Sequence, residues 1–401
     1  MRVLFTLQPG WAHFNPLINL ARLLEIKGYA VAFVTSSVFS QHILKQNFQC
    51  FPAGIDWEMS RAPEIFPELQ FVPISEHGLL MAHIFLEKTA LPMAKDVLHI
   101  AESWQANMII SDYTEFGGRI AAEVRGIPCV IVGFGVRFSV NNLKRVFAEA
   151  IAKLRNAFNL PPDPDMKSIY QYACFNFISP RWFQNVSDIM QTDYFFTPQG
   201  FDGSDDAPIT SLLDHLPKYP IVHAGFGTVY NKDILFNKKI IESFCNMPIN
   251  LIFATGHGTD ISVYKRFERY ENIRITSFVS YKQLLPHCDA MICHAGFNTL
   301  MSAIFHEVPI LLLPLTGDHP HLTQHSINNQ FALTIDEALE PNSFGAKLIN
   351  PNKITKKSIK HAVNRLLSEE SFKQHIKHAK CDLSNLSSCE DAIQLIEKLT
   401  C

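Results

Sequence analysis

A histidine and an aspartate in the first third of the chain have the side-chain types that acid–base chemistry needs. His13 follows the apolar run Arg2 to Leu7 and precedes Asn15 and Pro16, which we interpret as a helix N-cap and a first-turn proline, so we expect it in the loop between a strand and a helix. Asp112 ends a second apolar run. A helix dipole disfavours the imidazolium form, which leaves a neutral histidine available as general base, and a carboxylate on its other nitrogen would orient it. Because the chain has 17 histidines, a purely structural role for His13 stays open.

A second group of residues favours the binding of an anion. His294 follows the apolar run Ala290 to Cys293, and Gly296 allows a close approach of the backbone. Asn298 and Thr299 then occupy the first turn of the next predicted helix, where free N–H groups and the dipole favour negative charge. A diphosphate would fit this position.

An upstream turn, A-G-F-G-T, carries Gly227 and Thr228 directly after another apolar run. A short glycine turn of this kind can contact phosphate or sugar, but it also suits a plain connection between strand and helix.

Two patterns raise the possibility of a metal. His321 and His325 are four residues apart, close to Asp318 and His319, yet the glutamate of a zinc hydrolase helix is missing. The motif D-P-D begins at Asp163 and has the proline content of a turn. We therefore expect no metal and no other cofactor.

The elements that must position these residues are short apolar runs alternating with stretches of helical period. This order predicts an α/β fold with parallel sheets, in which ligands bind beyond the carboxyl ends of the strands. The expected strands are Arg2 to Leu7, Ala30 to Thr35, Met108 to Ser111, Cys129 to Phe134, one near Ile221, Leu251 to Ala254, Ile273 to Phe278, Ala290 to Cys293 and Ile310 to Leu313.

The length of 401 residues and a segment dense in Gly, Pro, Asp and Ser predict two domains. We expect a Rossmann-like domain at 1–200, a linker at 201–219, a second Rossmann-like domain at 220–370 and terminal helices at 371–401. Two such domains would face each other across a cleft.

The composition of the chain limits the classes of binding partner that we expect. The net charge of -3 gives no basic field for nucleic acid, and nine cysteines without a C-x-x-C pair indicate reduced thiols and a cytoplasmic protein. No apolar run is long enough to cross a membrane. The stretch Leu143 to Phe158 predicts a basic amphipathic helix, which either packs on its domain or lies on a membrane surface.

The motifs together resemble the UDP-glycosyltransferase family of the GT-B fold, which includes bacterial macrolide and antibiotic glycosyltransferases. The opening Q-P-G-W-A-H-F-N-P is similar to the family's G-H-x-x-P loop. The later H-A-G-F-N-T, continuing to Asp318, is similar to its donor signature. The two matches have the family's order and spacing and cover both expected domains.

The resemblance implies roles for particular residues. His13 would deprotonate an acceptor hydroxyl with Asp112 as its partner, and His294, Asn298 and Thr299 would hold the diphosphate of a nucleotide sugar. Asp318 and His319 would meet the sugar hydroxyls, and the segment at Phe278 and Val279 would bind the base, although Phe278 suits a core position equally well.

Three departures from the family pattern concern the same sites. Ala12 replaces the glycine before the expected base, and Ser302 stands where many members have a glutamate for the ribose. His319 replaces the commoner glutamine after Asp318.

We therefore expect an inverting transfer of a hexose from a UDP-sugar to a lipophilic acceptor, bound mainly by residues 57–91 and the helix after Asn141. A nucleotide-sugar epimerase and an inactive nucleotide-sugar-binding protein are the alternatives. The sequence says nothing about the oligomeric state.

Overall fold

The computed structural model describes residues 1–133, 135, 140–183, 189–198, 209–227, 229, 231–256, 258–343 and 345–399. Thr228 and the first part of the expected linker lie outside these residues. The chain forms two compact units. Unit 1 comprises Met1–Pro73, His77–Gln199 and Asn385–Cys401, and unit 2 comprises Ile74–Glu76 and Gly200–Ser384.

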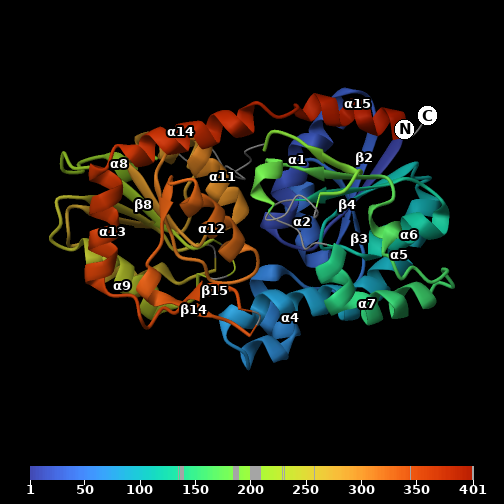
Figure 1. The fold of residues 1–401 in the computed structure, drawn as a ribbon, viewed down its shortest axis with the longest axis horizontal. Helices are drawn as coiled ribbons and strands as arrows, with labels where there is room; N and C mark the ends of the chain where they lie inside the picture. The colour runs from blue at the N-terminus through green and yellow to red at the C-terminus, as the bar shows by residue number, and fades with distance from the viewer. Residues whose placement is uncertain are drawn as a thin grey trace. The chain divides into compact units, whose positions relative to one another are not determined.

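Unit 1 is built on a parallel sheet with the strand order β3-β2-β1-β4-β5-β6-β7 (Figure 1). Its strands are β1 (Arg2–Thr6), β2 (Ala30–Thr35), β3 (Gln49–Pro52), β4 (Met108–Asp112), β5 (Cys129–Gly133), β6 (Ala173–Asn176) and β7 (Asp193–Phe195). Its helices are α1 (Trp11–Ile26), α2 (Ser37–Lys45), α3 (Ala62–Ile65), α4 (His77–His83), α5 (Ala90–Ser103), α6 (Gly117–Arg125), α7 (Val140–Asn156) and α15 (Cys389–Leu399).

Unit 2 repeats this plan with the strand order β10-β9-β8-β11-β12-β13. Its strands are β8 (Ile221–Gly225), β9 (Asn250–Ala254), β10 (Ile273–Thr276), β11 (Ala290–Cys293), β12 (Ile310–Leu312) and β13 (Ala332–Leu333), with a separate β14 (Leu339–Pro341) and β15 (Lys347–Ile349) hairpin. Its helices are α8 (Thr210–Leu213), α9 (Ile234–Phe244), α10 (Tyr281–Leu284), α11 (Phe297–Phe305), α12 (His319–Asn328), α13 (Lys356–Ser368) and α14 (Ser371–Ser384).

The strand order confirms the predicted fold class and locates the expected ligand sites. In each sheet the direction of strand addition reverses once, between β1 and β4 in unit 1 and between β8 and β11 in unit 2. The loops that leave two such strands diverge to opposite faces of the sheet, which opens a crevice at their carboxyl ends. His13 and Asp112 follow or end the strands of the first switch point, and Gly227 and His294 follow those of the second.

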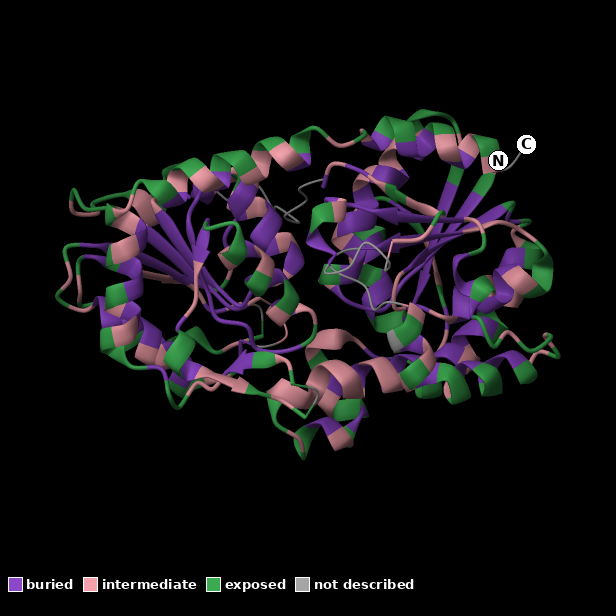
Figure 2. Cartoon of the chain, viewed as in Figure 1, coloured by how far each residue is buried: buried purple, intermediate pink, exposed green. Residues whose placement is uncertain are grey.

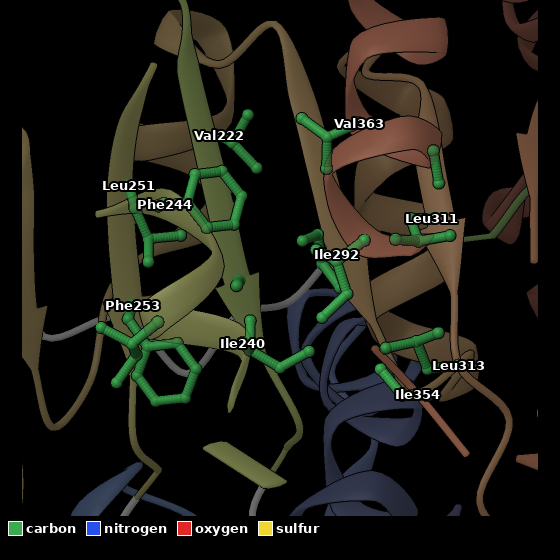
Figure 3. Close-up of a cluster of buried hydrophobic side chains, with 14 of the residues drawn as sticks. Val222, Ile240, Phe244, Leu251, Phe253, Ile292, Leu311, Leu313, Ile354 and Val363 are labelled. Atoms are coloured by element: carbon green, nitrogen blue, oxygen red, sulfur yellow. The ribbon is translucent and has the colours of Figure 1, made fainter. Parts of the chain in front are cut away.

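The central strands of each sheet are buried, whereas the covering helices expose their outer sides (Figure 2). In unit 2, apolar residues of the central strands pack against α9 and α13 in one continuous cluster, which includes Val222, Ile240, Phe244, Leu251, Phe253, Ile292, Leu311 and Val363 (Figure 3). A core of this kind holds the strand ends in fixed register, so that short loops can present side chains precisely enough for binding.

The predicted start of the first helix was wrong. Asn15 and Pro16 lie inside α1, which begins at Trp11, and Gly10 serves as its extended N-cap. The Gly10 carbonyl accepts hydrogen bonds from the N–H groups of His13 and Phe14. Pro16 is the sixth residue of α1 and has no N–H to donate to the Ala12 carbonyl one turn earlier. His13 therefore lies in the first turn of α1 and not in a loop.

The apolar face of the basic helix is packed on its own unit. Leu143, Phe147, Ile151 and Leu154 of α7 belong to a buried cluster of unit 1. Arg155 is buried and donates two hydrogen bonds to the Glu123 carboxylate. In the part of the chain that the structure describes, no helix is both long and apolar enough to span a membrane.

Candidate active site

The structure brings His13 and Asp112 together at the switch point of unit 1. Nδ1 of His13 lies 2.9 Å from a carboxylate oxygen of Asp112, and both side chains are buried. Because a carboxylate only accepts hydrogen bonds, Nδ1 carries the proton and Nε2 of the neutral ring keeps its lone pair. This is the tautomer that a general base requires.

Asp112 is itself fixed by neighbours that the sequence did not single out. One of its oxygens accepts from the Gln8 backbone N–H at 2.8 Å, and the other accepts from the Thr114 N–H and hydroxyl at 2.6 and 2.8 Å. Burial opposes ionisation most strongly, but His13 and these donors together outweigh it and hold the pKa of Asp112 below its ordinary value. The only local signal was the spacing Asp-x-Thr, which is typical of a turn stabilised by an aspartate.

A small hollow opens in unit 1 beside this pair, at the carboxyl ends of β1, β2 and β3. Its cavity volume is about 10 Å³, room for about one water molecule, and its lining includes Gln8, Ser36, Trp57, Met93 and Glu115. Trp57 also belongs to a buried apolar cluster formed by the segment that the sequence analysis assigned to the acceptor. The lining is mainly apolar with a few polar groups, but a cavity of this size is far too small for an organic ligand.

At the switch point of unit 2, His294 is enclosed by two glycine turns. A Cβ placed on Gly227 would lie 2.8 Å from Cε1 of the ring, and one placed on Gly296 would lie 2.6 Å from its Nε2. Any side chain at either position would therefore collide with the imidazole. Among the described residues Nδ1 of His294 has no hydrogen-bond partner, although the residue is only 8% exposed. Burial lowers the pKa of His294 to about 4, so the ring is neutral at physiological pH.

The helix that follows His294 presents an uncapped N-terminus. Gly296 is the N-cap of α11 and supplies no side-chain hydrogen bond, so Asn298 and Thr299 lie in a first turn with free N–H groups. Ala295 has a φ of +67°, a left-handed conformation that costs a non-glycine residue about 1 kcal/mol or more. Strain of this kind is typical of loops that place backbone groups against a ligand.

Ser302 is already engaged within the same helix. Its hydroxyl donates to the Asn298 carbonyl at 2.9 Å, one turn earlier. The position where many family members have a glutamate therefore carries a short side chain directed at its own backbone.

His319 lies next to His294. The two ring centroids are 4.9 Å apart in an edge-to-face arrangement. His319 begins α12, and its Nδ1 accepts from the N–H groups of Thr316 at 3.2 Å and Leu315 at 3.4 Å. Because Nδ1 is the acceptor, the proton of the neutral ring resides on Nε2. Burial, followed by the neighbouring His294, places the pKa of His319 well below its ordinary value.

The other residues predicted to bind the nucleotide sugar make fewer contacts that point to a ligand. Phe278 is half-buried, and its carbonyl accepts from the Thr276 hydroxyl at 2.8 Å. Val279 is buried in an apolar cluster with Ile252 and Leu284. Asp318 precedes α12, where its side chain makes no capping hydrogen bond.

Of the two patterns that raised the possibility of a metal, the D-P-D motif bonds to other groups. Asp163 accepts from the N–H groups of Lys167 and Ser168, and Asp165 pairs with Lys144 at 3.0 Å. Within the described ranges, no group of three or more His, Cys, Asp or Glu side chains is arranged to hold a metal ion.

Comparison with known proteins gives one consistent result. The profile of the glycosyltransferase family 28 C-terminal domain matches residues 226–396. The chain is 22% identical to the 4'-demethylrebeccamycin synthase of Lentzea aerocolonigenes over 99% of both sequences. It is 23% identical to the aclacinomycin-T 2-deoxy-L-fucose transferase of Streptomyces galilaeus, over 100% of this chain and 96% of that protein.

Solved structures agree on the fold. The glycosyltransferase VinC, crystallised in complex with DTDP, matches with a TM-score of 0.79 at 19% identity, over 100% of this chain and 99% of VinC. The spinosyn forosaminyltransferase SpnP matches with a TM-score of 0.76 at 17% identity over the same shares. The matched proteins span both units and share the two parallel sheets. The chain therefore has the GT-B fold of these structures and is similar over its whole length to bacterial antibiotic glycosyltransferases.

Proposed function

We propose that this enzyme transfers a hexose from a UDP-sugar to a hydroxyl of a lipophilic small molecule, with inversion at the anomeric carbon. His13 removes the proton of the attacking hydroxyl through Nε2, and Asp112 stabilises the imidazolium that forms. The observation that carries this mechanism is the 2.9 Å contact between His13 Nδ1 and the Asp112 carboxylate.

The donor half of the proposal rests on His294. Its unpartnered Nδ1, the free N–H groups of α11 and the two glycine turns form a cradle of hydrogen-bond donors at a helix N-terminus. Such a cradle stabilises the charge that develops on a departing diphosphate. The neutral His294 acts there as a hydrogen-bond donor and not as a cation. These groups take the place that a divalent metal has in other glycosyltransferases, so no metal is required.

Sugar recognition is assigned to Asp318 and His319, and base recognition to Phe278 and Val279. His319 offers a donor, Nε2–H, to a hydroxyl oxygen. The acceptor is assigned to the segment 57–91 of unit 1, whose buried apolar cluster includes Trp57 and Phe85. The Phe85 ring lies edge-to-face with the His13 ring. The apolar character of this segment favours a lipophilic molecule, and the relatives are named for antibiotics.

The alternatives gain no support from the relatives, of which one is named a synthase of an antibiotic and the other a deoxysugar transferase. An epimerase would release a changed sugar without any acceptor, and an inactive binding protein would bind the donor without turnover. Both outcomes are excluded if an acceptor-dependent glycoside appears and free sugar does not.

The test is calorimetric titration of UDP and dTDP into wild-type enzyme and His294→Ala, each with and without EDTA. We expect UDP to bind more tightly than dTDP, the variant to lose about tenfold in affinity through one hydrogen bond, and EDTA to change nothing. Tighter binding of dTDP would reassign the donor nucleotide. A loss of binding in EDTA that added magnesium or manganese restores would reject the metal-free cradle.

A further inference from the structure

Three turns stack side by side at the carboxyl edge of the second sheet. A Cβ placed on Gly256, after β9, would lie 2.5 Å from the carbonyl oxygen of Gly227, after β8. Gly227 in turn lies against the ring of His294, after β11. Because the three turns touch in sequence, the position of the Gly227 turn sets the space around His294.

A buried amide network lies behind these turns. The side-chain amide of Asn237, in α9, donates to the Asn231 carbonyl at 2.8 Å and to the Tyr264 hydroxyl at 3.0 Å. Asn231, in the segment that follows Gly227, donates through its own amide to the Thr255 carbonyl at 2.9 Å. The network thus joins the helix α9 to the turns that follow β8 and β9.

The chemistry of the partners fixes the orientation of both amides. Asn231 O and Thr255 O are main-chain carbonyls, which only accept, so each asparagine must direct its NH₂ group at them. Asn237 and Asn231 are each 1% exposed, so water does not replace a lost donor there. Both N–H groups of Asn237 are used, one towards the turn and one towards the core residue Tyr264.

We infer that Asn237 is a positioning residue for the donor diphosphate. Through Asn231 it holds the Gly227 turn against His294, and thereby sets where the ring and the N-terminus of α11 receive the phosphates. The inference rests on the donor site proposed above and adds the network that keeps this site in shape.

The test compares Asn237→Asp with Asn250→Asp. Asn250 is the matched control because it is also 1% exposed and its amide also donates to two acceptors, the carbonyls of Pro217 and Tyr219. It begins β9, whereas the glycine turns follow the carboxyl ends of β8 and β9. Both substitutions place an oxygen opposite at least one carbonyl oxygen, so both should lower the urea midpoint.

Only Asn237→Asp should weaken the donor site. We expect its dissociation constant for UDP to rise about tenfold, with KM for the nucleotide sugar rising more than kcat falls. The Cε1–H resonance of His294, assigned through His294→Ala, should shift in Asn237→Asp and stay in place in Asn250→Asp. A merely structural role would move the urea midpoint without moving this resonance.

If Asn237→Asp does not fold, Tyr264→Phe replaces it, because that change removes only a hydroxyl. We then expect a two- to fivefold rise in the UDP dissociation constant together with the shift of the His294 resonance. Wild-type UDP affinity and an unmoved resonance in the folded variant would overturn the inference. If the wild-type enzyme binds neither UDP nor dTDP, the proposed function fails instead, and the two failures are thereby distinguished.

Discussion

His13 lies in the first turn of α1, where the buried Asp112 carboxylate accepts a hydrogen bond from its Nδ1 at 2.9 Å. This contact fixes the orientation of the imidazole and leaves Nε2 as the nitrogen that can accept a proton.

His13→Ala should lower kcat by 10²- to 10⁴-fold, which is the usual contribution of a general base. UDP affinity should stay within twofold, because the proposed donor residues belong to unit 2. Steady-state kinetics with an alcohol acceptor, together with UDP calorimetry, measure both quantities. Wild-type turnover in this variant would refute the assignment of the base.

Asp112→Asn should show a similar loss of kcat for a different reason. An amide NH₂ directed at His13 Nδ1 would force the proton onto Nε2, which could then no longer accept one. If the NH₂ group faced Thr114 instead, it would oppose the Thr114 backbone N–H, from which the Asp112 carboxylate accepts a hydrogen bond. If activity in Asp112→Asn recovers at high pH to the wild-type level, the carboxylate serves only to raise basicity and not to select the tautomer.

Two substitutions at His319 separate recognition of the sugar from support of the loop. Asparagine can place its oxygen near the position of Nδ1 and keep the bonds from Thr316 and Leu315, but it lacks the Nε2–H. Glutamine instead reaches the position of Nε2 with a carboxamide.

We expect His319→Gln to change the kcat/KM ratio of two donor hexoses by tenfold or more, since one buried hydrogen bond is worth about 1–2 kcal/mol. His319→Asn should keep the wild-type Tm and lose sugar discrimination. Competition between UDP-glucose and UDP-galactose in one tube gives the ratio. A fall in Tm for both variants with an unchanged ratio would show that His319 only supports the loop.

At the scale of elements, two glycines at the start of α6 allow this helix to pack closely against β1 and α5. A Cβ on Gly118 would lie 2.1 Å from Oγ1 of Thr6 in β1, and one on Gly117 would lie 2.7 Å from the Ala94 backbone nitrogen in α5. The buried Glu115 carboxylate accepts from the N–H groups of both glycines at 2.6 and 2.7 Å. This helix start therefore packs against β1 and α5 through backbone, directly after Asp112.

Gly118→Ala should destabilise unit 1 by about 2–3 kcal/mol, because the methyl group must displace Thr6 in a close-packed interior. Gly126→Ala, at the C-terminal end of the same helix, is the control. Gly126 has a φ of +65° and open space around it, so that change should cost only about 1 kcal/mol. Urea unfolding followed by tryptophan fluorescence measures both, and equal losses would contradict the steric explanation.

At the scale of the whole molecule, the two units should respond differently to acid. Unit 2 buries His223 and His294, and burial lowers the pKa of each to about 4. The unfolded chain takes up protons below about pH 6.5 while these folded histidines stay neutral. The unfolded state therefore binds more protons in this window, and the stability of unit 2 falls as the pH falls from about 6.5 to 4.

Each of these histidines should lower the free energy of unfolding of unit 2 by up to about 3 kcal/mol at pH 4 relative to pH 7. Trp11, Trp57, Trp104 and Trp182 are the four tryptophans of the chain, and all belong to unit 1. Tryptophan fluorescence thus reports unit 1, and hydrogen exchange at β8 and β11 reports unit 2. We expect exchange in unit 2 to accelerate before the fluorescence changes, and His223→Leu to reduce the pH slope. A simultaneous loss of both signals would mean that the units unfold together.

The sequence by itself determined the features that are written locally along the chain. The strands Ala30–Thr35 and Ala290–Cys293 were predicted with the bounds that the structure has, because short apolar runs are a local signal. His294, Gly296, Asn298 and Thr299 are adjacent in one strand–turn–helix segment, so their shared site could be predicted from the string alone.

Only the tertiary structure decided the rest. His13 and Asp112 are 99 residues apart, and the parallel pairing of β1 with β4 brings them into contact. The local capping signal at Asn15 was overridden by the extended conformation of Gly10, which begins α1 earlier. The sequence did not predict the roles of Thr114, Gln8 and the Asn237 network. Their partners include backbone N–H and carbonyl groups, which are the same in nearly every residue. The types of side chain along the sequence indicate which chemistry is possible, but only the fold decides which backbone groups a given side chain contacts.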